Sequence, residues 1–210
     1  MRKFAIALAA MAAFAAPTQA AVVFTDTFDT ENGGVSQLNY TGFANFDVTG
    51  NHVDIVKTGT YGITCSKMCV DLDGTPGDGG LVSKGTWSYS KGDIIEFHVL
   101  ASDNQRNAIF APDDMEYGMY TSSNGTVSAL SSIAFGAGWA DYSVSFKALA
   151  AGDLSIFFKT PSADKRGPVV DAVSLSITSV PEAATWAMML GGFAIVGAAT
   201  RRRKTAVSFA

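Results

Sequence analysis

Hydrophobic and polar residues alternate in short segments through the middle of the chain. Ile95, Phe97 and Val99 are apolar, whereas Glu96 and His98 between them are polar. Successive side chains of a β-strand point to opposite faces, so a period of two predicts a strand that buries one face and turns His98 outward. Ten segments of this kind, separated by turn residues, are expected to be strands: residues 22–28, 52–56, 68–73, 81–89, 93–101, 116–121, 127–135, 140–148, 154–159 and 169–177. Many short strands joined by turns predict an all-β fold, an antiparallel β-sandwich or jelly roll.

The first twenty residues follow a different pattern. Arg2 and Lys3 precede an apolar run over residues 4–16, and small residues lead to Ala20. A positive start, a short apolar stretch and a small-residue ending are typical of a secretory signal peptide, here residues 1–20. The alternative, a retained anchor, is disfavoured because a membrane span needs about 18 or more apolar residues.

The C-terminal segment is again apolar. Residues 183–200 carry no charge, and Arg201, Arg202, Arg203 and Lys204 follow them. This length and the basic cluster behind it predict one transmembrane helix, with the body outside and the tail inside. Trp186 would lie at the outer end of this helix, at the level of the lipid headgroups. A buried apolar helix of the core is the alternative.

The same C-terminal residues carry a family resemblance. Pro181 and Glu182, the Trp-Ala-Met-Met run from Trp186, the apolar span and the arginines at 201–203 resemble the PEP-CTERM protein-sorting signal. The resemblance implies export by a Gram-negative bacterium that makes extracellular polysaccharide, and recognition by a membrane-embedded exosortase. The helix would then be a transient anchor, and processing would leave the protein at the cell surface or outside the cell. Ala183 departs from the family pattern, which has a second proline there.

These observations divide the chain into a signal peptide at 1–20, a β-sandwich domain at 21–179, a sorting signal at 180–204 and a tail at 205–210. The whole chain has a net charge of −4. Residues 21–180 hold nine Lys and Arg against eighteen Asp and Glu, a net charge of −9. An acidic body has no electrostatic attraction to nucleic acid or to anionic lipid.

The body has its own resemblance, to the galactose-binding-like jelly rolls of exported bacterial proteins. Residues 26–29, 70–74, 138–146 and 169–175 carry it. In that family an acidic residue after the first strand often lies close to an Asp of the last strand, where both bind a structural calcium ion. The resemblance therefore implies calcium at Asp29 and Asp171. Two carboxylates are only part of a calcium site, and a turn cap and a strand end explain them equally simply.

Cys65 and Cys69 are the two cysteines of the chain. In an exported protein such a pair is expected to form a disulfide, which here closes a short loop. Zinc would need further ligands, and His52 and His98 are the two histidines available. Free thiols are the remaining alternative.

The sequence holds little that points to catalysis, and a non-enzyme is expected. It has no Gly-x-Ser-x-Gly motif to support a serine hydrolase. Asp113, Asp114 and Glu116 cluster in a segment interpreted mostly as loop, and a glycosidase needs two opposed carboxylates. Solvated acids of a surface loop explain the same cluster, so a polysaccharide hydrolase is the weaker alternative.

Sugar recognition has more support, since jelly rolls often stack aromatic rings on the apolar face of a pyranose. Tyr117, Tyr120, Asn104 and Arg106 are expected to supply such a surface, whereas Trp139 is interpreted as core. The sequence thus predicts an exported surface or matrix protein whose sandwich binds or embeds in the exopolysaccharide of a biofilm. A passive structural protein without a specific ligand is the alternative.

Overall fold

A computed structural model of the chain describes residues 20–74, 77–106, 112–161, 166–180 and 183–202. The chain forms two compact units, which divide between Ser179 and Val180. Within the described residues, the first unit has a short 3-10 helix, η1 (Glu31–Gly34), and these strands: β1 (Ala21–Asp26), β2 (Phe46–Gly50), β3 (Asp54–Lys57), β4 (Met68–Asp71), β5 (Gly79–Ser83), β6 (Trp87–Tyr89), β7 (Ile94–Ser102), β8 (Asp113–Thr121), β9 (Gly125–Ile133), β10 (Ala140–Lys147), β11 (Gly152–Lys159) and β12 (Val169–Thr178).

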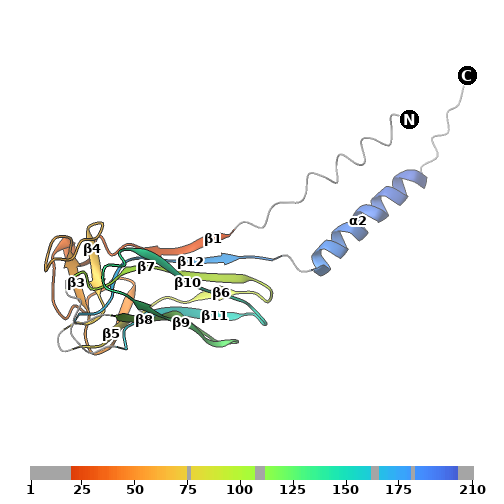
Figure 1. Cartoon of the computed structure of the whole chain (residues 1–210). Helices are drawn as coiled ribbons and strands as arrows, with labels where there is room; N and C mark the ends of the chain where they lie inside the picture. The colour runs from red at the N-terminus through yellow and green to blue at the C-terminus, as the bar shows by residue number, and fades with distance from the viewer. Residues whose placement is uncertain (1–19, 75–76, 107–111, 162–165, 181–182, 203–210) are drawn as a thin grey trace, which may run out of the picture. The chain divides into compact units, whose positions relative to one another are not determined.

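The strands form two antiparallel six-stranded sheets that face each other (Figure 1). Sheet A has the order β10-β7-β12-β4-β3, and β1 also pairs with β12. Sheet B has the order β2-β5-β11-β8-β9, and β6 also pairs with β11. The all-β sandwich expected from the alternating segments is therefore confirmed.

The expected strands are found, with two differences. The segment at 81–89 is two strands, because Ser83 Oγ donates a hydrogen bond to the carbonyl of Gly85 (2.9 Å) and accepts one from the backbone N–H of Ile156 (3.0 Å). This bridge ends β5, and β6 then pairs with the earlier half of β11. The sequence interpretation also missed β2, a five-residue strand at the edge of sheet B.

The core lies between the two sheets and is rich in phenylalanine. Phe28, Phe46 and Phe158 contact one another, with ring centroids 5.4 to 6.2 Å apart. Phe97 and Met115 are also fully buried in the same cluster. Burial of large side chains contributes about 1.5–3 kcal/mol each, so this cluster is the main source of stability in the sandwich.

A smaller cluster lies beside the disulfide. Cys65 and Cys69 are bonded, as expected, and Cys69 is fully buried with Val56, Ile63 and Val169. Cys65 and Trp139 pack against this group. Trp139 is half-buried, and its indole Nε1 donates to the carbonyl of Thr64 at 3.1 Å, so the expectation of a core position holds in part.

The second unit contains the helix α2 (Ala183–Arg202), which lies where an apolar helix is expected. Among the described residues, however, no helix is both long and apolar enough to cross a membrane. The expected membrane span is therefore not confirmed. The predicted signal peptide lies outside the described residues, apart from Ala20, as do Pro181, Glu182 and Arg203.

Candidate functional site

The outer face of sheet B carries an aromatic side chain where a polar one is expected. On β11, Leu154, Ile156 and Phe158 point into the core. The intervening residues point outward, and they include Phe157 and Lys159. Phe157 is only 2% exposed although it lies on this outer face, so other side chains must cover it.

The strand register sets out this face as rows across the sheet. One row runs from Glu116 on β8 through Lys159 on β11 and Gly80 on β5 to Thr49 on β2. A Cβ atom at position 80 would lie 2.3 Å from the Cβ of Lys159, so the Lys159 side chain occupies space that any larger residue would need.

The next row pairs Phe157 with Gly118 on β8 and with Val82 on β5. A Cβ at position 118 would lie 2.2 Å from the carbonyl of Val127, so Gly118 lets β8 and β9 approach closely. Because glycine has no side chain, it also leaves space beside the Phe157 ring.

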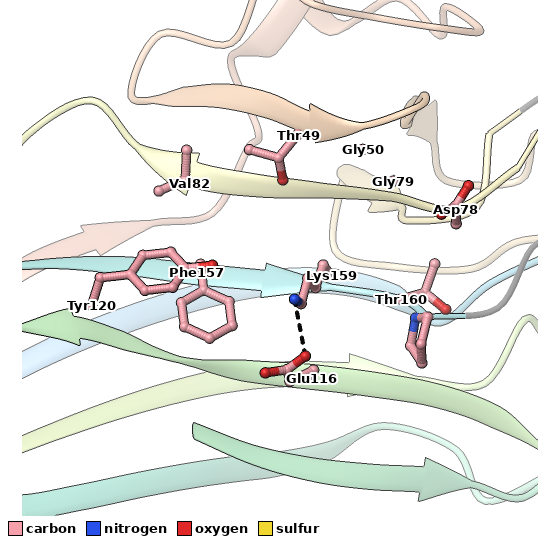
Figure 2. A pocket seen from close by; sticks show the side chains of 11 residues that line it. Thr49, Gly50, Asp78, Gly79, Val82, Glu116, Tyr120, Phe157, Lys159 and Thr160 are labelled. Atoms are coloured by element: carbon pink, nitrogen blue, oxygen red, sulfur yellow. Dashed lines mark ion pairs between the residues drawn. The ribbon is translucent and has the colours of Figure 1, made fainter. Parts of the chain in front are cut away.

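Tyr120 covers Phe157. The two rings stack with centroids 4.3 Å apart and an angle of 19° between their planes. Figure 2 shows the two rings together at one end of the hollow. Tyr120 remains 43% exposed, so its ring offers a flat apolar surface to solvent.

Polar groups surround the aromatic pair. Lys159 Nζ lies 3.0 Å from Glu116 Oε2 and 5.6 Å from the centroid of the Phe157 ring. Across the hollow, Thr49 and Asp78 come from the β2 and β5 side of the sheet (Figure 2). The hollow has a volume of about 360 Å³, and Thr160 and Pro161 complete the wall at the end of β11.

This arrangement can bind a ligand that has both a flat apolar face and several hydroxyl groups. The ring of Tyr120 would contact the apolar face, and the carboxylates, hydroxyls and ammonium group would form hydrogen bonds at its edges. Small-molecule sites combine apolar contact area with a few oriented polar groups in this way.

Of the two expected sugar-stacking tyrosines, only Tyr120 lies on this face. Tyr117 is 4% exposed and faces the core, where its ring meets that of Tyr142 edge to face at 6.2 Å. The two residues are three positions apart on β8, and in a strand an odd spacing puts side chains on opposite faces. The prediction that they form one surface is wrong for this reason.

Asn104 and Arg106 are also not on a binding surface. Asn104 is fully buried, and its backbone N–H donates to Asp113 Oδ2 at 2.8 Å. Arg106 forms an ion pair with the buried carboxylate of Asp71. These polar groups bond to each other, so the expectation of a sugar-binding role for Asn104 and Arg106 is replaced by a structural one.

Burial raises the pKa of Asp71 to about 7, although the Arg106 guanidinium acts in the opposite direction. The nearby carboxylates of Asp54 and Asp73 raise the pKa of Asp71 further. Burial likewise raises the pKa of Asp54, against a hydrogen bond that Oδ1 accepts from the Asn39 backbone at 2.7 Å. The charged form of Asp71 therefore depends on the Arg106 guanidinium.

The three acids considered for hydrolysis lie on β8 rather than in a loop. Asp113 is buried at the start of the strand and accepts hydrogen bonds from Asn104, whereas Glu116 is on the outer face beside Lys159. Asp114 lies on the same face as Glu116, two residues away. The buried position of Asp113 prevents it from acting with Glu116 as a pair of opposed carboxylates.

Asp29 and Asp171 do come together, as the resemblance implies. Ser66 Oγ lies 3.3 Å from Asp29 Oδ1 and 2.9 Å from Asp171 Oδ1, and Lys67 Nζ lies 3.6 Å from Asp29 Oδ2. A bulge in β12 at Asp171 turns this side chain out of the regular ladder. Hydroxyl, amide and ammonium donors thus already surround these oxygens, and this donor set fits calcium poorly. Across the described residues, no three His, Cys, Asp or Glu side chains are grouped to hold a metal ion.

The sequence interpretation missed Phe157, Lys159, Asp78 and Thr49. One signal was present for Phe157. Residues 157 and 158 are both Phe, and neighbouring residues of a strand face opposite sides, so one of the two rings must lie on the outer face.

Residues 179–204 match the family described as the PEP-CTERM protein-sorting motif. The chain carries this sorting motif, which implies export. The match includes Pro181, Glu182, Trp186 and the arginines at 201–203, and Trp186, Arg201 and Arg202 belong to α2. Among curated proteins, none matches the chain.

Solved structures share the fold of the sandwich. A cyclase from Fischerella sp. TAU is 8% identical with a TM-score of 0.54, and the match covers 78% of this chain and 100% of that one. TmCBM61, solved in complex with beta-1,4-galactotriose, is 12% identical with a TM-score of 0.44, covering 64% and 90%. The CBM22-1 xylan-binding domain of Paenibacillus barcinonensis Xyn10C is 11% identical with a TM-score of 0.42, covering 79% and 100%. At these identities the likeness concerns the fold alone.

Proposed function

We propose that this exported protein binds polysaccharide through the hollow on the outer face of sheet B. The observation that carries the proposal is the exposed ring of Tyr120, stacked on Phe157 beside Lys159 and Glu116. A pyranose has an apolar face of C–H groups and an edge of hydroxyls, and the hollow offers a complementary surface to each.

The stacked pair makes the ring of Tyr120 a rigid platform. Phe157 beneath it and the strand on which each residue lies restrict its motion, so little conformational entropy is lost when a sugar binds. The sorting motif supports a site outside the cell, where polysaccharide is available. We infer further that an exosortase-type membrane protease processes the chain at this motif, and that the released or surface-held sandwich then joins the extracellular polysaccharide.

The proposal is tested by affinity electrophoresis of the folded protein in native gels that contain soluble polysaccharides. Tyr120→Ala removes the exposed ring and is expected to weaken binding about tenfold, while Tyr120→Phe keeps the ring and most of the affinity. Tyr61→Ala is the matched control, because Tyr61 is 54% exposed in the turn after β3, outside the hollow.

Equal retention of the wild-type chain and Tyr120→Ala on every polysaccharide would contradict the proposal. No retention of the wild-type chain by any polysaccharide would favour the alternative, a passive component of the matrix. Thermal unfolding of each variant checks that a loss of binding does not follow from a loss of fold.

A further inference from the structure

The charges that line the hollow are unequal. Glu116 and Asp78 each bring a carboxylate, and Lys159 brings the one ammonium group among the described lining residues. Asp78 keeps its position because the side-chain amide of Asn51 donates to Oδ1 and the Asn51 backbone N–H donates to its carbonyl at 2.8 Å. The described residues that line the hollow therefore have a net charge of −1.

The ammonium group of Lys159 is already engaged. Its Nζ lies 3.0 Å from Glu116 Oε2, and the Phe157 ring lies beneath it. The side chains of Lys159 and Glu116 are 40% and 31% exposed, so a ligand can reach both members of this pair. An incoming carboxylate would lie close to the carboxylate of Glu116, whose negative charge already balances the charge of Lys159.

The aromatic surface and the net charge of the sandwich also disfavour an anionic ligand. The exposed face of the Tyr120 ring carries the negative part of the aromatic quadrupole, which repels an anion placed above it. At longer range, residues 21–180 have a net charge of −9, which slows the approach of a polyanion at low ionic strength.

From these charges we infer that the hollow takes a neutral glycan and rejects polymers of uronic acid. The inference rests on the proposed function, because it names the substrate class of the same site. The hydroxyl groups of a sugar can donate hydrogen bonds to Glu116 and Asp78 and accept one from Lys159. A neutral sugar therefore bonds to all three side chains without breaking the ion pair between Lys159 and Glu116.

The experiment uses native gels that contain either a neutral polymer (hydroxyethylcellulose, laminarin or galactan) or polygalacturonate, at 20 and 200 mM NaCl. The wild-type chain is expected to bind at least one neutral polymer with an affinity that changes little with salt. In gels that contain polygalacturonate, it is expected to migrate as fast as in gels without polymer. Salt screens charge interactions but leaves ring stacking and neutral hydrogen bonds nearly unchanged.

Glu116→Gln frees the Lys159 ammonium while keeping the shape of the side chain. This variant is expected to gain about threefold in affinity for polygalacturonate at 20 mM NaCl, an effect of the size measured for exposed ion pairs, and to lose the gain at 200 mM. Asp114→Asn is the matched control, because it removes the same charge from the same face of β8 outside the hollow.

Salt-dependent binding of the wild-type chain to polygalacturonate, stronger than to the neutral polymers, would overturn the inference and leave the proposed function standing. An equal gain in Glu116→Gln and Asp114→Asn would overturn it too, because the effect would then come from net charge alone. Binding to none of the polymers would overturn the proposed function itself.

Discussion

His98 lies between two carboxylates on the outer face of sheet A. Its Nδ1 is 2.7 Å from Asp141 Oδ2 on β10, and its Nε2 is 3.4 Å from Glu96 Oε1 on its own strand. Burial lowers the pKa of His98, but the hydrogen bond with Asp141 and the charges of both carboxylates outweigh that effect, and the pKa is raised above its ordinary value.

A histidine with a raised pKa in the folded chain stabilises the fold while it is protonated. This contribution is complete below the ordinary pKa of about 6.5 and is lost as the pH rises through the higher folded pKa. His98→Asn is therefore expected to cost about 0.5 kcal/mol at pH 5.5 and less at pH 8.5, measured by urea unfolding. Asp141→Asn should show the same trend, and a cost that grows with pH would contradict this account.

The outward position of His98 was predicted correctly, because alternation along β7 is regular and its inward residues are all apolar. The same rule applied to β8 would have separated Tyr117 from Tyr120. The partner of Arg106 could not be found in this way, because Asp71 is 35 residues from Arg106 in the chain.

At the scale of elements, the segment that follows β7 is fixed to the rest of the sandwich by polar contacts. Arg106 bonds to the end of β4 through Asp71, and Gln105 contacts Thr64 with both its side-chain oxygen (3.0 Å) and its amide nitrogen (3.2 Å). The disulfide loop that follows Thr64 is thereby joined to the end of β7. The segment after β7 and the connection between β3 and β4, which are distant in sequence, therefore support each other at this end of the sandwich.

Arg106→Met leaves the carboxylate of Asp71 buried without its cation. Removing one partner of a buried pair costs about 3–5 kcal/mol, which lowers the melting temperature by about 10 °C. The cost should be larger at pH 8 than at pH 5, because a protonated Asp71 needs no cation. Lys91→Met, at an exposed position, is the control. Polysaccharide binding is expected to be unchanged, and its loss would return Arg106 to the role first predicted for it.

Most strands could be predicted from the sequence, because alternation is a local signal. Pairing is not local, and for this reason the division of residues 81–89 was missed. Both β5 and β6 pair with β11, and the interruption between them depends on Ser83 reaching Ile156, which lies 73 residues further along the chain.

At the scale of the whole molecule, the sandwich and the sorting motif are separate units. Among the described residues, every member of the two buried clusters precedes Thr178. A sandwich released by processing would keep its core intact.

The C-terminus of the exported protein tests this organisation. In cells that possess an exosortase, mass spectrometry should find a mature chain that ends near the motif, whereas Pro181→Ala or Trp186→Ala should leave most of the chain unprocessed. The processed form should melt within about 1 °C of the unprocessed one, since the two share a core. An intact C-terminus in the wild-type protein would contradict the sorting proposal.

Gly80 has a consequence for how the hollow can change during evolution. Lys159 fills the space above this position, so any larger residue on that part of β5 would displace the charged side chain from the site. Thr49 and Val82 already carry side chains, and they line the opposite wall of the hollow (Figure 2). Related chains that recognise different sugars are therefore expected to vary at 49 and 82 while position 80 remains glycine.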